Sequence, residues 1–497
     1  MKFSCRVDDA MRVSADSVVL FVSQSTKVDS PRLKSLDKQV GGAIGNMFGS
    51  GEFSGKDGEV AVLYSPGGFK TKRLILAGTG DRKKLTPDSI RRASGHLSRN
   101  KAVTSSGSVA ISFEGFESVG MIQAGIEGLL LGGHKFLEYK TGEAGKDSSK
   151  LNSVEFLVPK RAQLAKAVKE LERGQIIAEG QLMVRRLSAT PGNDLTPRLY
   201  ANRIAKFAKD AGVTCQILDE KAIANEKMGG LLGVSRGSDE PPRFVILKYQ
   251  RSAAKSKPIV LVGKGVTFDT GGISLKPAEN MGEMKQDMTG SAVMLATIIT
   301  ASRLKLPLNL VALLPITENM PSGRATKPGD ILTMRSGKTV EVTNTDAEGR
   351  LILADALDYA NRFQPQAVFD IATLTGAALF ILGYAGAPIM GNNSELIKRL
   401  EGAAKVTSER VWHIPIWDDH REQMKSSIAD LVNSGGRPAG TIAAAAFLEN
   451  FVGEWPWAHI DIAWMDMEYQ GRPYTPKGAT GFGVRLLTDL LSNWKKM

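Results

Sequence analysis

Residues 258–265 read PIVLVGKG, a nearly continuous apolar run that ends in glycine and lysine. A run of this kind, without alternation, is typical of a strand buried on both faces of a parallel sheet. Three further runs have the same character, namely FVILKY at 244–249, LNLVALLPI at 308–316 and AVFDIATL at 367–374. Stretches with helical character lie at 198–211, 290–304 and 351–363. We therefore predict an α/β fold whose larger, C-terminal part has a mostly parallel central sheet.

The first 160 residues show the same alternation on a smaller scale. Short apolar runs predict strands at 18–22, 60–64, 73–78, 109–113 and 154–158. Helices are predicted at 86–99 and 119–133. This pattern indicates a smaller N-terminal α/β domain with helices around a mostly parallel sheet.

A long amphipathic helix is predicted between these two parts. Apolar residues recur from Leu164 to Leu182 at spacings of three, four and seven, and charged residues fall largely off that face. The pattern ends before the breaker cluster at Thr190-Pro191-Gly192. We expect an N-terminal domain, a linker helix and a larger C-terminal domain, with the boundaries 1–160, 161–187 and 188–497.

Composition describes a globular protein of more than one domain. The chain has 497 residues, of which 42% are hydrophobic and 23% are charged. Its two cysteines, Cys5 and Cys215, lie far apart and predict no disulfide framework, which favours a reducing compartment. Asp8, Asp9 and Asp16 interrupt the apolar residues near the start, and no run approaches the ~20 apolar residues of a membrane helix. We expect a cytoplasmic protein that does not contact a membrane.

The net charge of +12 is denser in the N-terminal third. Residues 1–160 carry 23 Lys or Arg and 17 Asp or Glu, a difference of +6. Small basic clusters lie at Lys70/Lys72/Arg73, at Arg82–Lys84 and at Arg91/Arg92. Such a surface could attract DNA, but these clusters lack interleaved aromatic residues and any known nucleic-acid motif. A solvated surface is therefore the favoured interpretation, with DNA binding as an alternative.

Two short windows concentrate the residues that could do chemistry, KGVTFDTGGISLK at 264–276 and NTDAEGRL at 344–351. Together with one residue between them they supply the carboxylates Asp269, Asp287, Asp346 and Glu348. Buried together without cations, these groups would repel one another, whereas two divalent cations would neutralise all four. The set therefore indicates a two-metal hydrolytic site. Asp287 could instead cap the helix predicted to begin at 290.

Three cations accompany the carboxylates. Lys264 cannot ligate a metal as an ammonium, and from its chemistry alone it is a charge partner. Lys276, after the flexible Gly271-Gly272 pair, could stabilise an oxyanion. The planar fork of Arg350 suits a small planar anion such as bicarbonate, or a carboxylate.

Other common catalytic signatures are missing from the sequence. None of the five histidines forms an HExxH pair, and neither a GxSxG elbow nor a GxxxxGK[ST] phosphate loop occurs. We expect His459, within WAHIDIA, to be a packed, hydrogen-bonded core residue rather than a metal ligand.

At NTDAEGRL the chain resembles the leucyl (cytosol) aminopeptidase family of metal-dependent exopeptidases. The segments VGKGVTFDTGGISLKP and MKQDMTGSAVML match the family's metal-binding segments, and DIATLTGA, TPGNDLTP and KGATG also resemble it. The resemblance covers about 188–490, and IEGLLLGGHKFLEYK at 126–140 is similar to the end of the family's N-terminal domain.

The resemblance implies a role for each residue of the site. The readily exchanged metal would be bound by Lys264, Asp269, Asp287 and Glu348. The tighter metal would be bound by Asp269, Glu348 and Asp346, the last also through its main-chain carbonyl. The metals would be manganese, zinc or magnesium. Lys276 and Arg350 would be catalytic, with a bicarbonate on Arg350 as proton acceptor, and the substrate would contact Met284, Thr373 and Leu374.

The implied activity is release of the N-terminal residue, Leu or another apolar residue, from peptides by a homohexamer. Two alternatives stay open at this point. A different two-metal hydrolase, such as a phosphoesterase or nuclease, also uses clustered carboxylates, although NTDAEGRL does not fit one. The other is an additional DNA-binding or regulatory role of the basic N-terminal domain, which some family members have.

Overall fold

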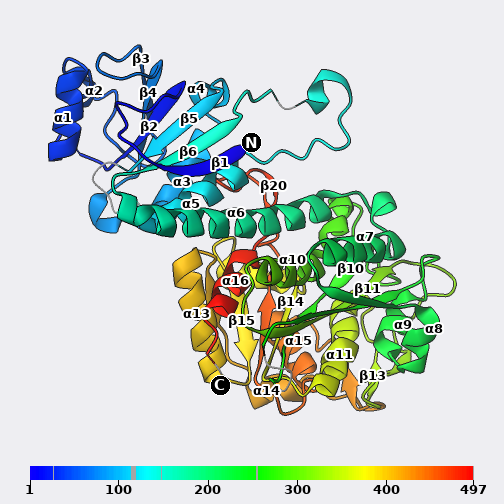
Figure 1. Cartoon of the computed structure of the whole chain (residues 1–497). Coiled ribbons are helices and arrows are strands. Elements are labelled where there is room, and N and C mark those ends of the chain that lie inside the picture. Colours follow the sequence, from blue (N-terminus) through cyan, green and yellow to red (C-terminus); the bar gives the residue numbers. More distant parts are fainter. Residues whose placement is uncertain (26, 114–118, 147, 253–255, 496–497) are drawn as a thin grey trace. The chain divides into compact units, whose positions relative to one another are not determined.

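The computed structural model describes residues 1–25, 27–113, 119–146, 148–252 and 256–495 (Figure 1). The chain divides into two compact units. The first unit comprises Met1–Glu179 and Tyr469–Lys477, and the second comprises Gly180–Glu468 and Gly478–Met497.

The first unit is built on a six-stranded sheet in which all neighbouring strands are parallel except β3 and β4. Its order is β1 (Lys2–Val7), β6 (Ser153–Val158), β5 (Ser108–Ser112), β2 (Ser17–Val22), β4 (Arg73–Gly78) and β3 (Val60–Tyr64). Every residue of β2 is buried because this inner strand is covered on both faces. Val19 and Phe21 join one core, whereas Val18 and Leu20 join the other.

Helices supply the two covering layers of this sheet. Ile90 of α3 and Ile126 of α5 pack in the core that contains Val19. Leu33 of α1 and Phe48 of α2 pack in the opposite core. The bounds are α1 (Pro31–Gln39), α2 (Ala43–Ser50), α3 (Pro87–Leu97), α4 (Lys101–Thr104) and α5 (Ile122–Gly132).

The predicted strands of this unit are present, and its predicted helices are present with ends shifted by a few residues. Strand β1 and the helices α1 and α2 were not predicted. The sequence of β1, KFSCRV, mixes charged and apolar residues, as expected of a partly exposed strand at the edge of the described sheet, where it pairs with β6. Such an edge strand lacks the apolar run by which a buried strand is recognised.

Helix α6 (Arg161–Ala189) confirms the expected long helix, and it contributes to both units. Ala167 and Leu171 pack in the core of the first unit, and Val184 and Leu187 pack in a core of the second. The apolar face of this helix is therefore divided between two separate cores.

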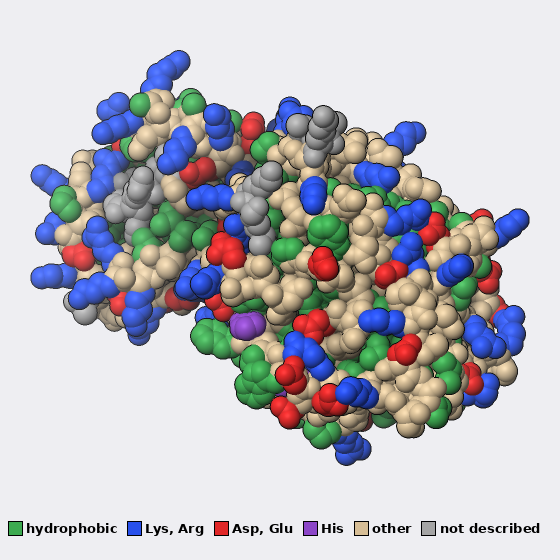
Figure 2. All heavy atoms as spheres, turned by 90° about the horizontal axis from the view of Figure 1, so that it is seen from below, with side chains coloured by type: hydrophobic (Ala, Val, Ile, Leu, Met, Phe, Trp, Pro, Cys, Tyr) green, Lys and Arg blue, Asp and Glu red, His purple; other side chains and the backbone are tan. Residues whose placement is uncertain are grey.

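A short segment from far along the sequence completes the first unit. The Tyr474 hydroxyl donates a hydrogen bond to Asp88 (2.8 Å), and the Arg91 guanidinium lies over the Tyr474 ring (5.7 Å to its centroid). Arg91 is buried and paired with Asp88 and Glu127 (2.9 and 2.8 Å). This arginine, expected to be part of a basic cluster, therefore serves an internal ion-pair network. On the face shown in Figure 2, Lys and Arg side chains are interspersed with Asp and Glu.

The second unit is built on a nine-stranded, mostly parallel sheet. Its order is β16 (Val411–His413), β15 (Ala387–Gly391), β18 (Trp457–Asp461), β14 (Ala367–Ala372), β9 (Ile259–Gly263), β11 (Asn309–Asn319), β8 (Arg243–Gln250) and β7 (Thr214–Leu218), with β10 (Gly265–Asp269) pairing with β11. The central strands β18, β14, β9 and β11 are parallel. β8 runs antiparallel to both of its neighbours. The predicted α/β class with a mostly parallel sheet is confirmed.

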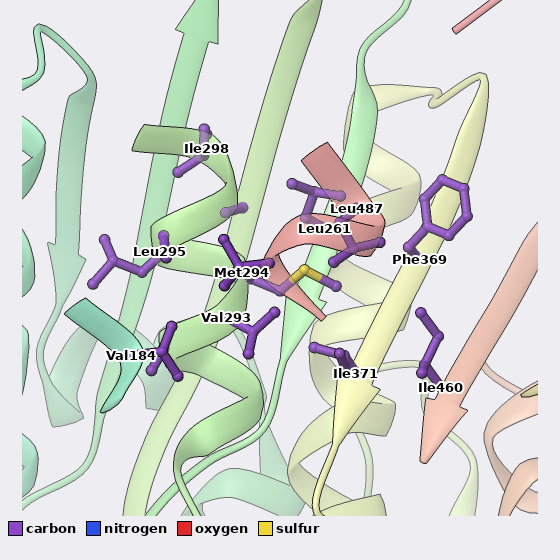
Figure 3. Packing of buried hydrophobic residues seen from close by; sticks show 14 of the residues in the cluster. Val184, Leu261, Val293, Met294, Leu295, Ile298, Phe369, Ile371, Ile460 and Leu487 are labelled. Atoms are coloured by element: carbon purple, nitrogen blue, oxygen red, sulfur yellow. The ribbon is translucent and has the colours of Figure 1, made fainter. Parts of the chain in front are cut away.

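Alternate residues of the central strands face two different layers. Phe369 and Ile371 of β14 pack with Val293 of α10 and Leu487 of α16 (Figure 3). Val368 packs in the other core, with residues of α11 and α15. The helices of this unit include α7 (Pro197–Asp210), α8 (Glu220–Asn225), α9 (Gly229–Ser235), α10 (Thr289–Arg303), α11 (Glu348–Ala360), α12 (Leu379–Leu382), α13 (Ser394–Thr407), α14 (Asp418–Glu422), α15 (Gly440–Glu449) and α16 (Val484–Ser492).

Two small sheets accompany the large one, formed by β12 (Ile331–Thr333), β13 (Thr339–Glu341) and β17 (Leu431–Val432), and by β19 (Met467–Glu468) and β20 (Gly478–Ala479). Among the described residues, no helix has both the length and the apolar character needed to cross a membrane.

The packing of α3 on the 469–477 segment predicts opposite effects for two Gly→Ala substitutions. A Cβ atom at Gly95 would lie 2.6 Å from the carbonyl carbon and oxygen of Pro473, whereas one at Gly49 would meet nothing within 4 Å. Because backbone atoms must move, we expect Gly95→Ala to lower the free energy of unfolding by about 1–3 kcal/mol, in spite of the better helix propensity of alanine.

The matched control is Gly49→Ala in α2, which we expect to be more stable than the parent by about 0.5–1 kcal/mol. Urea or thermal unfolding of the full-length chain measures both effects. Equal stabilisation by the two substitutions would contradict the close packing of α3 on this segment.

Candidate metal centre

The charged residues converge where several strands and helices begin or end. Lys264 directly follows β9, and Asp269 is the last residue of β10. Asp287 follows the 3-10 helix η5 (Met281–Gln286), and Glu348 is the first residue of α11. Ligand sites in α/β sheets collect beyond the carboxyl ends of parallel strands, and this site lies beyond the end of β9.

Lys264 is buried at the centre of one half of the site. Its Nζ atom lies 2.7 Å from Asp287 Oδ2 and 2.9 Å from Glu348 Oε1, and it donates a hydrogen bond to the Thr373 carbonyl (2.9 Å). A Cβ atom at Gly349 would lie 2.6 Å from Lys264 Cε. The glycine of NTDAEGRL therefore leaves the space through which the lysine reaches Glu348.

Lys276 bridges the other half of the site. Its Nζ atom lies 2.8 Å from Asp269 Oδ2 and is also paired with Asp346. The turn before it needs glycine, because Gly271 and Gly272 have φ values of 85° and 66°. A Cβ atom at Gly271 would also lie 2.5 Å from the Ser274 carbonyl oxygen.

The opposing charges shift the pKa values of both lysines upward. Burial lowers the pKa of Lys264, but the carboxylates of Asp287 and Glu348 outweigh it and raise the pKa above its ordinary value. Burial also lowers the pKa of Lys276, and there Asp269 and Glu348 outweigh it in the same way. The neighbouring carboxylates therefore raise the pKa values of both lysines, whereas a divalent cation beside them would lower these values.

Burial is the main influence on the pKa values of three of the carboxylates. It raises the pKa values of Asp287, Asp346 and Glu348, which the lysines only partly counteract. The Oδ1 atom of the fourth carboxylate, Asp269, accepts hydrogen bonds from Asn319 Nδ2 (2.8 Å) and from the Gly271 amide (2.9 Å), which fix its position.

Arg350 occupies a buried position beside this cluster. Its Nη1 atom donates a hydrogen bond to the Asn433 carbonyl (2.8 Å), and within the described part of the chain its Nε atom has no hydrogen-bond partner. Burial lowers the pKa of Arg350 to about 10, against the opposing charges of Glu348, Asp461 and Asp346. A buried guanidinium with an unpaired donor can hold a small anion.

A loop after β14 closes the site. The Thr373 hydroxyl donates a hydrogen bond to Asp287 Oδ1 (2.8 Å), and the Leu374 amide donates to Asp461 Oδ1 (3.1 Å). Met284 lies in η5, and its carbonyl oxygen accepts a hydrogen bond from the Asp287 amide (3.3 Å). Asp287 therefore contacts Lys264 and this loop and does not cap α10, whose N-cap is Met288 without a side-chain hydrogen bond.

The structure thus brings the predicted lysines and carboxylates into direct contact. Oxygen atoms of Asp269, Asp346 and Glu348 lie within 4.8 Å of one another and could hold a metal ion. Glu348 Oε2 is buried and, among the described residues, has no hydrogen-bond partner. Hard divalent cations favour such oxygen donors.

Sequence reasoning did not identify three supporting residues, Asn319, Asn433 and Asp461. Asn433 accepts the Thr343 amide (2.8 Å) and donates to the Asn344 carbonyl (2.7 Å), so it holds the loop before α11. The two asparagines carry no recognisable motif. Asp461 did have a signal, because it is a charge between the apolar residues Ile460 and Ile462.

Family models match most of the chain. The cytosol aminopeptidase catalytic domain matches residues 182–488, and the N-terminal domain of the same family matches residues 18–143.

Full-length relatives agree with these matches. The chain is 42% identical over 486 residues to a probable cytosol aminopeptidase of Syntrophotalea carbinolica, covering 97% of this chain and 98% of the relative. It is 41% identical over 494 residues to a probable cytosol aminopeptidase of Geobacter sulfurreducens, covering 99% of both. Among solved structures, the bottromycin maturation enzyme BotP is similar, with a TM-score of 0.84, 33% identity and coverage of 96% of this chain and 99% of BotP. A second BotP structure, in complex with Mn, is similar to the same degree.

These matches extend over both units and include the buried carboxylate cluster. The chain therefore belongs to the cytosol aminopeptidase family, peptidase M17, and is a metal-dependent aminopeptidase of that family.

Proposed function

We propose that the chain removes the N-terminal residue from peptides with two divalent cations bound at the carboxylate cluster. The observation that carries this proposal is that four carboxylates pack, within the described part of the chain, against two lysine ammonium groups. Two dications would balance the four negative charges, and Glu348 Oε2, which has no hydrogen-bond partner among the residues described, is a further oxygen donor.

The ligands divide into two sets that share residues. Lys264, Asp269, Asp287 and Glu348 would hold the more exchangeable cation. Asp269, Glu348 and Asp346 would hold the tighter one, with help from the Asp346 carbonyl. Lys264 would serve as a neutral amine, because an ammonium has no lone pair. The carboxylates raise the pKa of Lys264, but bound cations would lower it and so favour the neutral amine. Manganese is the first candidate, because a BotP structure is in complex with Mn; zinc and magnesium are the others.

When bound, the cations would polarise a carbonyl group and lower the pKa of a water molecule. The residues of the chain would do the remaining work. Lys276, released from its ion pairs with Asp269 and Asp346, would direct its ammonium at the carbonyl oxygen where negative charge develops. Arg350 would hold a bicarbonate as the general base, since its buried fork has an unpaired Nε donor among the described residues.

The substrate would be a peptide with a free amino terminus. Thr373 and Leu374 are suited to contact its backbone, because their loop is held against the cluster by Asp287 and Asp461. Met284 would line the pocket for an apolar first side chain such as that of leucine. From the family resemblance and the names of the relatives we also propose a homohexamer in the cytoplasm.

Metal dependence is the first test. Purified protein treated with a chelator should lose hydrolysis of leucine p-nitroanilide, and manganese, zinc or magnesium should restore it because the carboxylates need cations to build the site. The N-acetylated substrate should not be cleaved under any condition. Folded protein without activity in any metal would refute the proposed function, and cleavage of a phosphodiester instead would support another two-metal hydrolase.

Lys276 should act on the reaction rather than on the fold. We expect Lys276→Ala to lower kcat about 10²–10³-fold, with a smaller change in KM, because an oxyanion contact contributes mainly in the transition state. Lys327→Ala, which removes an exposed lysine paired with Asp330, is the matched control and should keep normal kcat. An unchanged kcat in Lys276→Ala would rule out the oxyanion role.

Gly349 should be required for metal binding. In Gly349→Ala the new methyl group would displace Lys264, whose Nζ atom lies 2.8 Å from the position of the added Cβ. Calorimetric titration with manganese should show weaker binding, and kcat should fall. Gly402→Ala in α13, where a Cβ meets nothing within 4 Å, should leave both unchanged. Normal manganese affinity in Gly349→Ala would contradict the placement of Lys264 in the metal site.

A further inference from the structure

The chain after β18 makes a tight turn in which Trp464 has an unusual backbone conformation. The Met465 amide donates a hydrogen bond to the Ile462 carbonyl (2.9 Å), and Trp464, the third residue of this turn, has a φ value of 70°. Turn positions with positive φ favour glycine, because a side chain crowds the backbone there. A bulky aromatic residue in this conformation is strained, and such strain is typical of functional sites.

Three contacts hold Trp464 in place. Its amide donates a hydrogen bond to the Asp466 side chain. Its indole Nε1 atom donates to the Gly376 carbonyl (3.0 Å), and its ring meets the Tyr384 ring edge to face, with 6.2 Å between the ring centroids. The side chains of Trp464 and Tyr384 are both partly exposed. The indole ring is therefore fixed beside Gly376 and still presents an apolar surface.

The turn that carries Trp464 lies beside the proposed substrate loop. Strands β14 and β18 are parallel neighbours, so the segments that follow them leave the sheet side by side. Asp461, the last residue of β18, accepts the Leu374 and Ala463 amides on the same oxygen atom (both 3.1 Å). This carboxylate joins the two segments just before Trp464 and Gly376 come into contact.

The same segment also contacts the element that carries Met284. Gln286 Nε2 of η5 donates a hydrogen bond to Met467 Sδ (3.5 Å). Met284 lies in the same 3-10 helix and is proposed to line the pocket for the first side chain. Residues 464–467 therefore extend from the substrate loop to η5, the two elements that are proposed to contact the first residue of the peptide.

We propose that Trp464 is a specificity-determining residue, whose indole ring limits the size of the first side chain that the pocket accepts. This inference rests on the proposed aminopeptidase function. The ring is rigid, apolar and fixed by contacts on three sides, so it can act as a wall. An aliphatic side chain such as that of leucine would pack against the ring, whereas a large aromatic side chain would collide with it.

Trp464→Gly removes the wall and keeps the turn, because glycine adopts a φ of 70° without strain. Trp464→Phe keeps an aromatic ring of smaller size. The matched control is Trp412→Ala, which removes an exposed tryptophan of β16 whose exposed fraction is 64%.

The measured quantity is kcat/KM of the manganese-loaded protein for the p-nitroanilides of leucine and phenylalanine. We expect W464G to raise the ratio of phenylalanine to leucine at least about tenfold, because the fit of a side chain in an apolar pocket changes discrimination by this order. W464F should raise the ratio less, and W412A should keep the wild-type ratio. A wild-type ratio in folded W464G would overturn the proposal.

Dipeptides show whether the ring acts on the second residue instead. Leu-Gly and Leu-Phe share their first side chain, so W464G should leave the ratio of their kcat/KM values within about twofold of wild type. A changed dipeptide ratio together with an unchanged p-nitroanilide ratio would overturn the proposal and assign Trp464 to the second residue.

Binding gives a readout that does not need turnover. In calorimetric titrations of the manganese-loaded protein with leucine hydroxamate and phenylalanine hydroxamate, W464G should shift relative affinity toward the phenylalanine compound. Unchanged relative affinity would contradict a wall at Trp464. If W464G does not fold, W464F decides the question: a phenylalanine-to-leucine ratio above that of wild type supports the proposal, and a wild-type ratio overturns it.

The two proposals fail in different ways. A folded wild-type protein that is inactive with every metal would refute the aminopeptidase function, and the role of Trp464 with it. Active wild-type and W464G proteins with the same substrate preference would refute only the role of Trp464.

Discussion

Charge balance in a buried space is the constraint on which the site depends. Asp269, Asp287, Asp346 and Glu348 come together in a space where burial, and after it the charge of neighbouring carboxylates, raises the pKa of the last three. Among the described residues, Lys264 and Lys276 form the ion pairs that oppose these negative charges. Charges removed from water persist only when they are paired or coordinate a metal. A cluster with four carboxylates and two ammonium groups is therefore arranged to accept cations.

The scaffold satisfies this constraint by placing the ends of strands and the start of a helix at the site. Lys264 lies where β9 ends and β10 begins, and Glu348 lies where α11 begins. The contacts need close approaches that side chains would block, at Gly349 beside Lys264 and at Gly271 beside Asp346. Glycines within the two motifs are therefore as important to the geometry as the charged residues.

Much of the fold could be predicted from sequence, because buried parallel strands have nearly continuous apolar sequences. β9, β11 and β14 were found in this way. The direction of β8 could not be found, since an antiparallel strand covered on both faces has the same apolar run as a parallel one. The edge strand β1 was missed because partial exposure removes the pattern.

The sequence by itself determined which chemistry is available, since the order of charged residues and glycines in KGVTFDTGGISLK and NTDAEGRL carries it. Only the tertiary structure decided which groups these charged side chains contact. It set Asp287 against Lys264 and Thr373 instead of at a helix cap, and it buried Asp461 against the loop after β14. The reason is physical: local sequence determines which groups a segment carries, but burial and long-range pairing determine which charges must neutralise one another.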